Sequence, residues 1–187
     1  MEAKIVYFDR PGQENTDEVL RIARERAKEL GIKTVLVAST RGETAVKAVE
    51  ALSGLRVVIV THSFGFSAPN TQTFTEENRK IVESKKGIML TATHAFAGVS
   101  RGMRNKTNTT AIGDLVAQVL RALGDGMKVV IEIAMMAADA GLVRTDEEVI
   151  AVAGTGKGAD TAVVLNPVTS QNFLDVKVKE ILCKPRF

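Results

Sequence analysis

Residues 35–44, V-L-V-A-S-T-R-G-E-T, decide the fold, because a short apolar run passes through a hydroxyl-rich turn directly into a helical pattern. The apolar run covers 34–38, the length of a buried strand, and the alanines, valine and leucine of 42–52 recur on one helical face. A strand that leads into an amphipathic helix is the repeating unit of an α/β sheet.

The same alternation recurs along the chain. Runs such as 56–60, R-V-V-I-V, are apolar without a period of two, which is typical of strands covered by helices on both faces. We predict a three-layer α/β/α fold with a mostly parallel sheet, in a single domain over 1–187. The predicted strands are 4–8, 34–38, 56–60, 88–92, 149–153, 162–166 and 176–182, and the predicted helices end at Leu30, Leu52, Ser84, Leu123 and Gly141.

Three segments carry more specific predictions. The segment 127–141 is apolar on most sides, so we expect a helix that is buried by its own domain or by a second subunit of a homo-oligomer. Lys177 and Lys179 alternate with valines, as in edge strands that resist further pairing. Residues 61–75 and 93–110 are expected to form long loops, which are often functional.

Composition excludes several classes of protein. The 25 basic and 22 acidic residues leave a net charge of +3, too mild for a dedicated nucleic-acid binder. No apolar run has the length of a membrane span or the layout of a secretory leader. One cysteine, Cys183, rules out an internal disulfide and suits a reducing cytoplasm, so we predict a cytoplasmic protein.

The turn after the strand 34–38 is the first candidate site. Its hydroxyls and backbone N–H groups lie at the start of a helix, where the helix dipole favours an anion. The turn lacks the G-x-x-x-x-G-K-[ST] pattern of triphosphatases, so a phosphate monoester is the better match. The alternative is a capped turn that binds nothing. The predicted phosphate-binding residues are Ser39, Thr40, Arg41, Gly42 and Thr44.

A second turn, A-G-T-G-K-G, follows the strand 149–153. Because ligands of parallel α/β sheets bind beyond the carboxyl ends of the strands, both turns are expected to open onto one edge. Its glycines permit close approach of a ligand, and its lysine can reach a phosphate. We include Gly154, Thr155, Gly156, Lys157 and Gly158 in the predicted site.

The only two histidines occur in similar settings, T-H-S-F-G-F and T-H-A-F-A-G, each just past a predicted strand. His62 and His94 are candidates for ligand hydrogen bonding or acid–base chemistry, and no neighbouring spacing suggests a metal site. The phenylalanines beside them, Phe64, Phe66 and Phe96, are either core residues or the apolar wall of a pocket. The His-x-Phe step after each strand favours a pocket wall, so Phe64 and Phe96 are included in the predicted site. Arg101 is included because 84–113 contains basic but no acidic residues.

The order V-A-S-T-R-G-E-T-A-V-K-A-V-E-A-L followed by R-V-V-I-V-T resembles the C-terminal effector-binding domain of pyruvate kinase. The resemblance implies that 39–44 is the loop that holds a phosphate of a sugar bisphosphate, and that Lys157 and Gly158 lie in the second ligand loop. Arg41 stands where that family has a serine, and the Trp-Arg-Pro-Gly pattern of its second loop is missing. The catalytic barrel is also missing, which implies a stand-alone archaeal type of relative without pyruvate kinase activity.

The same turn is similar to the T-x-T-G-x-T loop with which flavodoxins hold flavin mononucleotide (FMN). Flavodoxins flank the flavin with Trp or Tyr, whereas this chain has no Trp and one Tyr, so the phenylalanines or histidines would replace them. We predict a binding domain for a phosphorylated small molecule, FMN first and a sugar phosphate second. The alternative is an enzyme that uses His62 or His94 as the acid–base group on a phosphorylated substrate.

Overall fold

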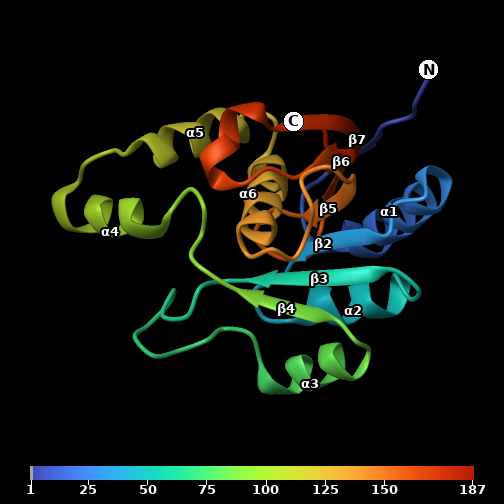
Figure 1. Cartoon of the computed structure of the whole chain (residues 1–187), viewed down its shortest axis with the longest axis horizontal. Helices are drawn as coiled ribbons and strands as arrows, with labels where there is room; N and C mark the ends of the chain where they lie inside the picture. Colours follow the sequence, from blue (N-terminus) through green and yellow to red (C-terminus); the bar gives the residue numbers. More distant parts are fainter. Residues whose placement is uncertain (1) are drawn as a thin grey trace.

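A central sheet lies between helices on both of its faces in the computed structural model of the chain, which describes residues 2–187 (Figure 1). Within these residues the strands are β1 (Val6–Phe8), β2 (Thr34–Ala38), β3 (Arg56–Thr61), β4 (Ile88–Thr91), β5 (Val149–Ala153), β6 (Thr161–Asn166) and β7 (Lys177–Pro185). The α-helices are α1 (Thr16–Leu30), α2 (Glu43–Ala51), α3 (Glu76–Ser84), α4 (Gly98–Thr107), α5 (Ile112–Arg121) and α6 (Asp125–Asp139), and two short 3₁₀ helices cover Gln13–Asn15 and Ser170–Asp175.

The strand order is β1-β7-β6-β5-β2-β3-β4. The strands β5, β2, β3 and β4 pair in parallel, and β1 is parallel to β7, while β6 is antiparallel to both of its neighbours. The predicted α/β fold with a mostly parallel sheet is therefore confirmed. Because β2 to β5 point the same way, the segments that follow them all leave from one edge of the sheet.

The two faces of the sheet form separate cores. Val35 and Val37 of β2 point to one face and pack with buried residues of α1, α2 and α3. Leu36, between them, points to the other face and packs with α6 and part of α5. This alternation along one strand explains why the strand reads as apolar throughout.

Helix α6 is the most deeply buried helix of the described chain, since nearly all of its residues, from Gly126 to Ala138, are inaccessible to solvent. The predicted helix over 127–141 is confirmed, and its own sheet covers it. Its apolar composition therefore gives no reason to invoke a second subunit, and self-association stays an untested prediction. None of the helices within residues 2–187 combines the length and hydropathy needed to cross a membrane.

Two sequence predictions were wrong in detail. Residues 93–110 are not all loop, because α4 occupies ten of them; glycines at 98 and 102 hide this helix in the sequence. Strand β7 is also not an edge strand throughout, since β1 pairs with its last part, at Cys183 to Pro185. The predicted edge character holds only for its first part, where Lys177 and Lys179 lie beyond the end of β1.

Cys183 lies at the point where β7 is paired on both sides, with Val6 of β1 and Ala162 of β6. Its side chain is fully buried. Burial in apolar surroundings raises the pKa of the Cys183 thiol to about 12, so the thiol is protonated at neutral pH. The cysteine is a core residue of the sheet.

Candidate functional site

A cavity of about 1000 Å³ opens at the carboxyl edge of the parallel strands. Its walls come from the segments after β2, β3 and β5, from the start of α1 and from one side of α6, and His94 after β4 also reaches it. The sequence prediction that these segments meet at one edge is confirmed. Of the predicted residues, the cavity is lined by Ser39, Thr40, Arg41, Thr44, His62, His94, Gly154, Gly156, Lys157 and Gly158.

The turn between β2 and α2 is held in place by its own hydroxyls and by α3. The buried Ser39 Oγ accepts a hydrogen bond from the backbone N–H of Ala45 at 3.3 Å, which caps the first turn of α2. The Arg41 carbonyl accepts hydrogen bonds from the Asn78 amide at 3.0 Å and from the Thr75 backbone N–H at 3.1 Å. These contacts fix the backbone and leave the Arg41 side chain at the cavity wall.

Gly42 is required at the start of α2. Its φ of +114° lies in the region that side chains disfavour, and an added Cβ would lie 2.4 Å from the Cβ of Asn78. Gly42 therefore shapes the turn, although it is not itself among the residues that line the cavity.

The turn between β5 and β6 is organised around Asp160, which is fully buried. Its carboxylate accepts hydrogen bonds from the backbone N–H groups of Gly12 at 3.1 Å and Thr155 at 3.0 Å, and from the Thr161 hydroxyl at 2.7 Å. Gly158 packs against the 3₁₀ helix that precedes α1, where an added Cβ would lie 2.3 Å from the Cα of Gln13. The predicted second loop is thus a rigid turn that presents Lys157 to the cavity.

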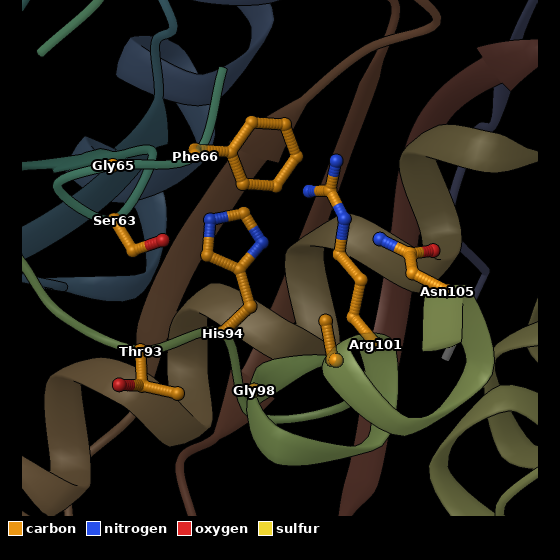
Figure 2. Close-up of a pocket in the computed structure, with 10 residues that line it drawn as sticks. Ser63, Gly65, Phe66, Thr93, His94, Gly98, Arg101 and Asn105 are labelled. Carbon is orange, nitrogen blue, oxygen red and sulfur yellow. The ribbon is translucent and has the colours of Figure 1, made fainter. Parts of the chain in front are cut away.

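Aromatic rings form the wall beyond the two turns. The Phe66 ring centroid lies 4.0 Å from that of His62 and 5.1 Å from that of His94, and the two imidazoles are 5.3 Å apart. Figure 2 shows the Phe66 ring beside the imidazole of His94. The His62 Nε2 atom lies 3.5 Å from the Thr40 hydroxyl, so the ring wall adjoins the first turn.

Both imidazoles are neutral at pH 7. Burial, together with the neighbouring His94 and Arg101, lowers the pKa of His62 to about 4. Burial also lowers the pKa of His94, and this effect outweighs the opposing influence of Glu132. In the described chain, His62 Nδ1 and His94 Nε2 are buried without a hydrogen-bond partner. Each histidine therefore retains an unused polar atom at the site.

A buried ion pair, Lys128–Glu132 on α6, also lines the cavity. The Glu132 carboxylate accepts hydrogen bonds from Lys128 Nζ and from the Phe96 backbone N–H, the latter at 3.1 Å, and lies 4.0 Å from His94 Nδ1. This pair was not among the site residues predicted from the sequence. Its signal was two charged residues four apart on an otherwise apolar helix, but the pattern does not tell which face the helix turns to the cavity.

Besides Gly42, four predicted site residues do not line the large cavity. Phe64 is 62% exposed and does not line the cavity, and Phe96 is a core residue that packs edge-on against Phe173 at 5.6 Å. The Thr155 hydroxyl is buried and does not line the cavity. Arg101 lines a smaller neighbouring cavity, which Phe66 and His94 separate from the large one.

No group of three or more His, Cys, Asp or Glu side chains within residues 2–187 is placed to hold a metal ion. The charged groups around the large cavity are of both signs. The basic ones are Arg41, Lys47, Lys128 and Lys157, and the acidic ones are Glu14, Asp17, Glu43, Asp125 and Glu132. Hydroxyls and backbone turns complete the polar lining.

The fold defines an α/β domain with its candidate site in a cavity at the carboxyl edge of the parallel strands. The sequence model of the family described as "Pyruvate kinase, alpha/beta domain" matches residues 17–165. The chain belongs to this family. The match spans β2 to β6 and both turns, so it includes the predicted site.

A comparison with solved structures finds a pyruvate kinase from Cryptosporidium parvum, at 10% sequence identity and a TM-score of 0.42. The alignment covers 82% of this chain and 23% of that enzyme. The chain therefore spans about a quarter of the length of that pyruvate kinase.

Proposed function

We propose that this protein binds a phosphorylated small molecule in the large cavity, with FMN as the first candidate and a sugar phosphate as the second. The observation that carries the proposal is the meeting of two glycine-containing turns and a ring wall around one cavity of about 1000 Å³. Cavities that enclose whole cofactors reach roughly this size.

The phosphate is assigned to the turn at 39–44. Helix α2 starts there, so its first N–H groups and its dipole favour an anion. Arg41 and Lys157 line the cavity from the two turns, and neither side chain forms an ion pair within residues 2–187. Lys47, by contrast, is paired with Asp17 at 2.8 Å. Arg41 and Lys157 are therefore free to pair with a phosphate monoester, while the carboxylates of Glu14 and Glu43, which form no ion pair within residues 2–187, line the same cavity.

The ring of the ligand is assigned to the wall formed by His62, Phe66 and His94. A neutral imidazole and a phenyl ring both offer a flat face without a charge to desolvate, which suits stacking of a planar heterocycle. Lys128 lines the same cavity, and its ammonium is the kind of donor that carbonyl oxygens of a flavin accept. This arrangement supports FMN above a small sugar phosphate.

The test compares FMN with riboflavin, which lacks only the phosphate, by thermal unfolding and by absorption after gel filtration. FMN at about 100 times its dissociation constant is expected to stabilise the protein by about 2.7 kcal/mol, and riboflavin by less. The double variant Arg41→Gln, Lys157→Gln should lose most of the difference between the two ligands. Lys80→Gln, which removes an exposed cation on α3, is the control and should retain it.

If neither FMN nor a panel of sugar phosphates raises the unfolding temperature, the proposal fails. If riboflavin binds as tightly as FMN, the cavity binds a flavin but the phosphate assignment is wrong.

A second candidate function, acid–base catalysis on a phosphorylated substrate, is favoured by the two neutral imidazoles at the cavity wall. Neutral imidazole is the form that accepts a proton. His62→Gln and His94→Gln should then lower kcat for a substrate found by screening, while the affinity for that substrate is retained. Loss of affinity with unchanged kcat would assign the histidines to binding alone.

We also infer that the chain has no pyruvate kinase activity, because the family match covers an α/β domain and the resemblance places phosphoryl transfer in the separate barrel. Formation of ATP from phosphoenolpyruvate and ADP by the purified protein would contradict this inference.

A further inference from the structure

The smaller cavity, of about 250 Å³, is lined on one side by α4 and on the other by the segment after β3. Figure 2 shows the Arg101 guanidinium next to the Phe66 ring, with the Asn105 side chain nearby and Ser63 across the cavity. A single water occupies about 30 Å³ of liquid, so the space holds a molecule of about eight heavy atoms. It is too small for a nucleotide-sized ligand.

Arg101 is the only charged side chain of this lining in the described chain. Its guanidinium carbon lies 3.7 Å from the centroid of Phe66, a stacked geometry that holds the plane of the fork. Within residues 2–187 Arg101 forms no ion pair, in contrast to Arg104 of the same helix, which is paired with Asp114. The N–H groups of the stacked Arg101 guanidinium are therefore available to another partner.

The other polar groups of the lining are uncharged. Asn105 offers an amide, Ser63 a hydroxyl, and His94 an imidazole kept neutral by burial. Glu132, behind His94, already neutralises Lys128. The net charge presented to the cavity is therefore a single positive one. A monoanion with a planar, bidentate acceptor matches it, whereas a phosphate dianion would lack a second cation.

We propose that the cavity between α4 and the segment 63–66 is a binding site for a small monocarboxylate, whose carboxylate accepts hydrogen bonds from the fork of Arg101 and from Asn105. The site is distinct from the large cavity, and Phe66 and His94 form the partition between them. The carboxylate is thus placed on the other side of the ring wall from the proposed phosphorylated ligand.

The experiment measures binding of acetate, lactate and benzoate by NMR titration, with acetamide, lactamide and benzamide as uncharged counterparts. At least one carboxylate is expected to bind, and its amide to bind about tenfold more weakly or worse, because a charge-assisted fork contributes that much discrimination. Arg101→Gln should weaken carboxylate binding by about tenfold to a hundredfold. Arg101→Lys should restore only part of it, since an ammonium lacks the fork.

Lys106→Gln is the matched control, because it removes one positive charge from the same helix at an exposed position outside the cavity. It should change the affinity by less than about twofold. Circular dichroism of each variant verifies that the overall helix content is unchanged. Equal weakening by Lys106→Gln and Arg101→Gln would overturn the proposal, as would equal binding of amide and carboxylate or no binding of any carboxylate. Each titration is made with and without FMN, so that failure here is distinguished from failure of the proposed function.

Discussion

At the scale of single residues, the Lys128–Glu132 pair connects stability to the site. Glu132 is 3% exposed and accepts hydrogen bonds from both a lysine and the Phe96 backbone. Neutralising it leaves the Lys128 ammonium buried without a counter-charge, which typically costs 3–5 kcal/mol. We therefore expect Glu132→Gln to lower the free energy of unfolding by about that amount, measured by urea denaturation.

The control for this substitution is Glu147→Gln, because Glu147 pairs with Arg144 on the surface. Exposed pairs contribute about 1 kcal/mol or less, so this variant should be nearly neutral. The double variant Lys128→Met, Glu132→Gln should recover part of the loss by removing the unpaired charge. A loss no larger for Glu132→Gln than for Glu147→Gln would show that the buried pair is not tightly coupled to folding.

The histidines predict a pH dependence of stability. The pKa of His62 is lowered in the folded state from 6.5 to about 4, so the unfolded chain binds the proton first as pH falls. The stability from neutral His62 is fully present above pH 6.5 and is lost between pH 6.5 and about 4. His94 acts in the same direction. We expect the free energy of unfolding to decrease between about pH 7 and pH 5, above the range in which most carboxylates titrate.

Because the chain has only two histidines, the assignment can be checked directly. The double variant His62→Gln, His94→Gln should show a flatter profile over this pH range in urea titrations. An unchanged slope would mean that the imidazoles are protonated in the folded protein or that other groups control this range.

Also at this scale, the sequence identified the two turns and both histidines because each lies at a strand end, where parallel topology brings residues together. It did not separate Phe66, which lines both cavities, from Phe64, which is exposed. Phe64 and Phe66 are two residues apart in an irregular segment. The orientation of each side chain there depends on backbone angles that the pattern of residue types does not encode. Likewise, Arg101 was assigned to the site by charge, and only the position of α4 places it in a second cavity.

At the scale of elements, substitution by alanine at two helical glycines is expected to change the stability of the protein in opposite directions. Gly126 of α6 packs so closely that an added Cβ would lie 2.2 Å from the Thr161 hydroxyl, whereas a Cβ on Gly102 of α4 would meet nothing within 4 Å. Gly126→Ala should destabilise the protein by about 1–3 kcal/mol, as overpacking does. Gly102→Ala should stabilise it by about 0.5–1 kcal/mol through helix propensity. Thermal unfolding of both variants checks the pair.

If Gly126→Ala stabilises the protein, the contact between α6 and β6 can accommodate a methyl group, and the prediction of overpacking is wrong. If Gly102→Ala leaves the unfolding temperature unchanged, α4 contributes little to the cooperative unfolding transition of the protein.

The helices and strands differ in how well the sequence predicts them. The strands β2, β3, β5 and β6 and the helix α6 followed from apolar runs and helical spacing, since tertiary packing there agrees with local preference. Helix α4 did not, because its glycines and polar residues have weak helix propensity and it packs mainly against α5. The pairing of β1 with β7 joins the two ends of the described chain, and no local signal encodes such a contact.

At the scale of the whole molecule, both cores share the same strands, because alternate residues of β2 point to opposite faces. We therefore expect a single unfolding transition. Leu52→Ala in the core of α1 to α3, and Met135→Ala in the core of α6, should each lower the stability of the entire protein by about 2–5 kcal/mol. Helix content and hydrogen exchange should report coincident transitions in both variants.

A variant that melts one helical layer while the amide protons of the other stay protected would contradict this expectation and indicate two independent units.

The location of Cys183 makes its rate of chemical labelling a measure of how often the native structure opens. A thiol that is fully buried and protonated does not react with alkylating reagents, because the thiolate is the nucleophile. Since it is the single cysteine of the chain and its side chain lies in the core that contains α1, every labelling event records an opening of that core. The labelling rate, followed by mass spectrometry under native conditions, therefore measures how often this core opens, and its slowing by a bound ligand reads out binding without any change to the sequence.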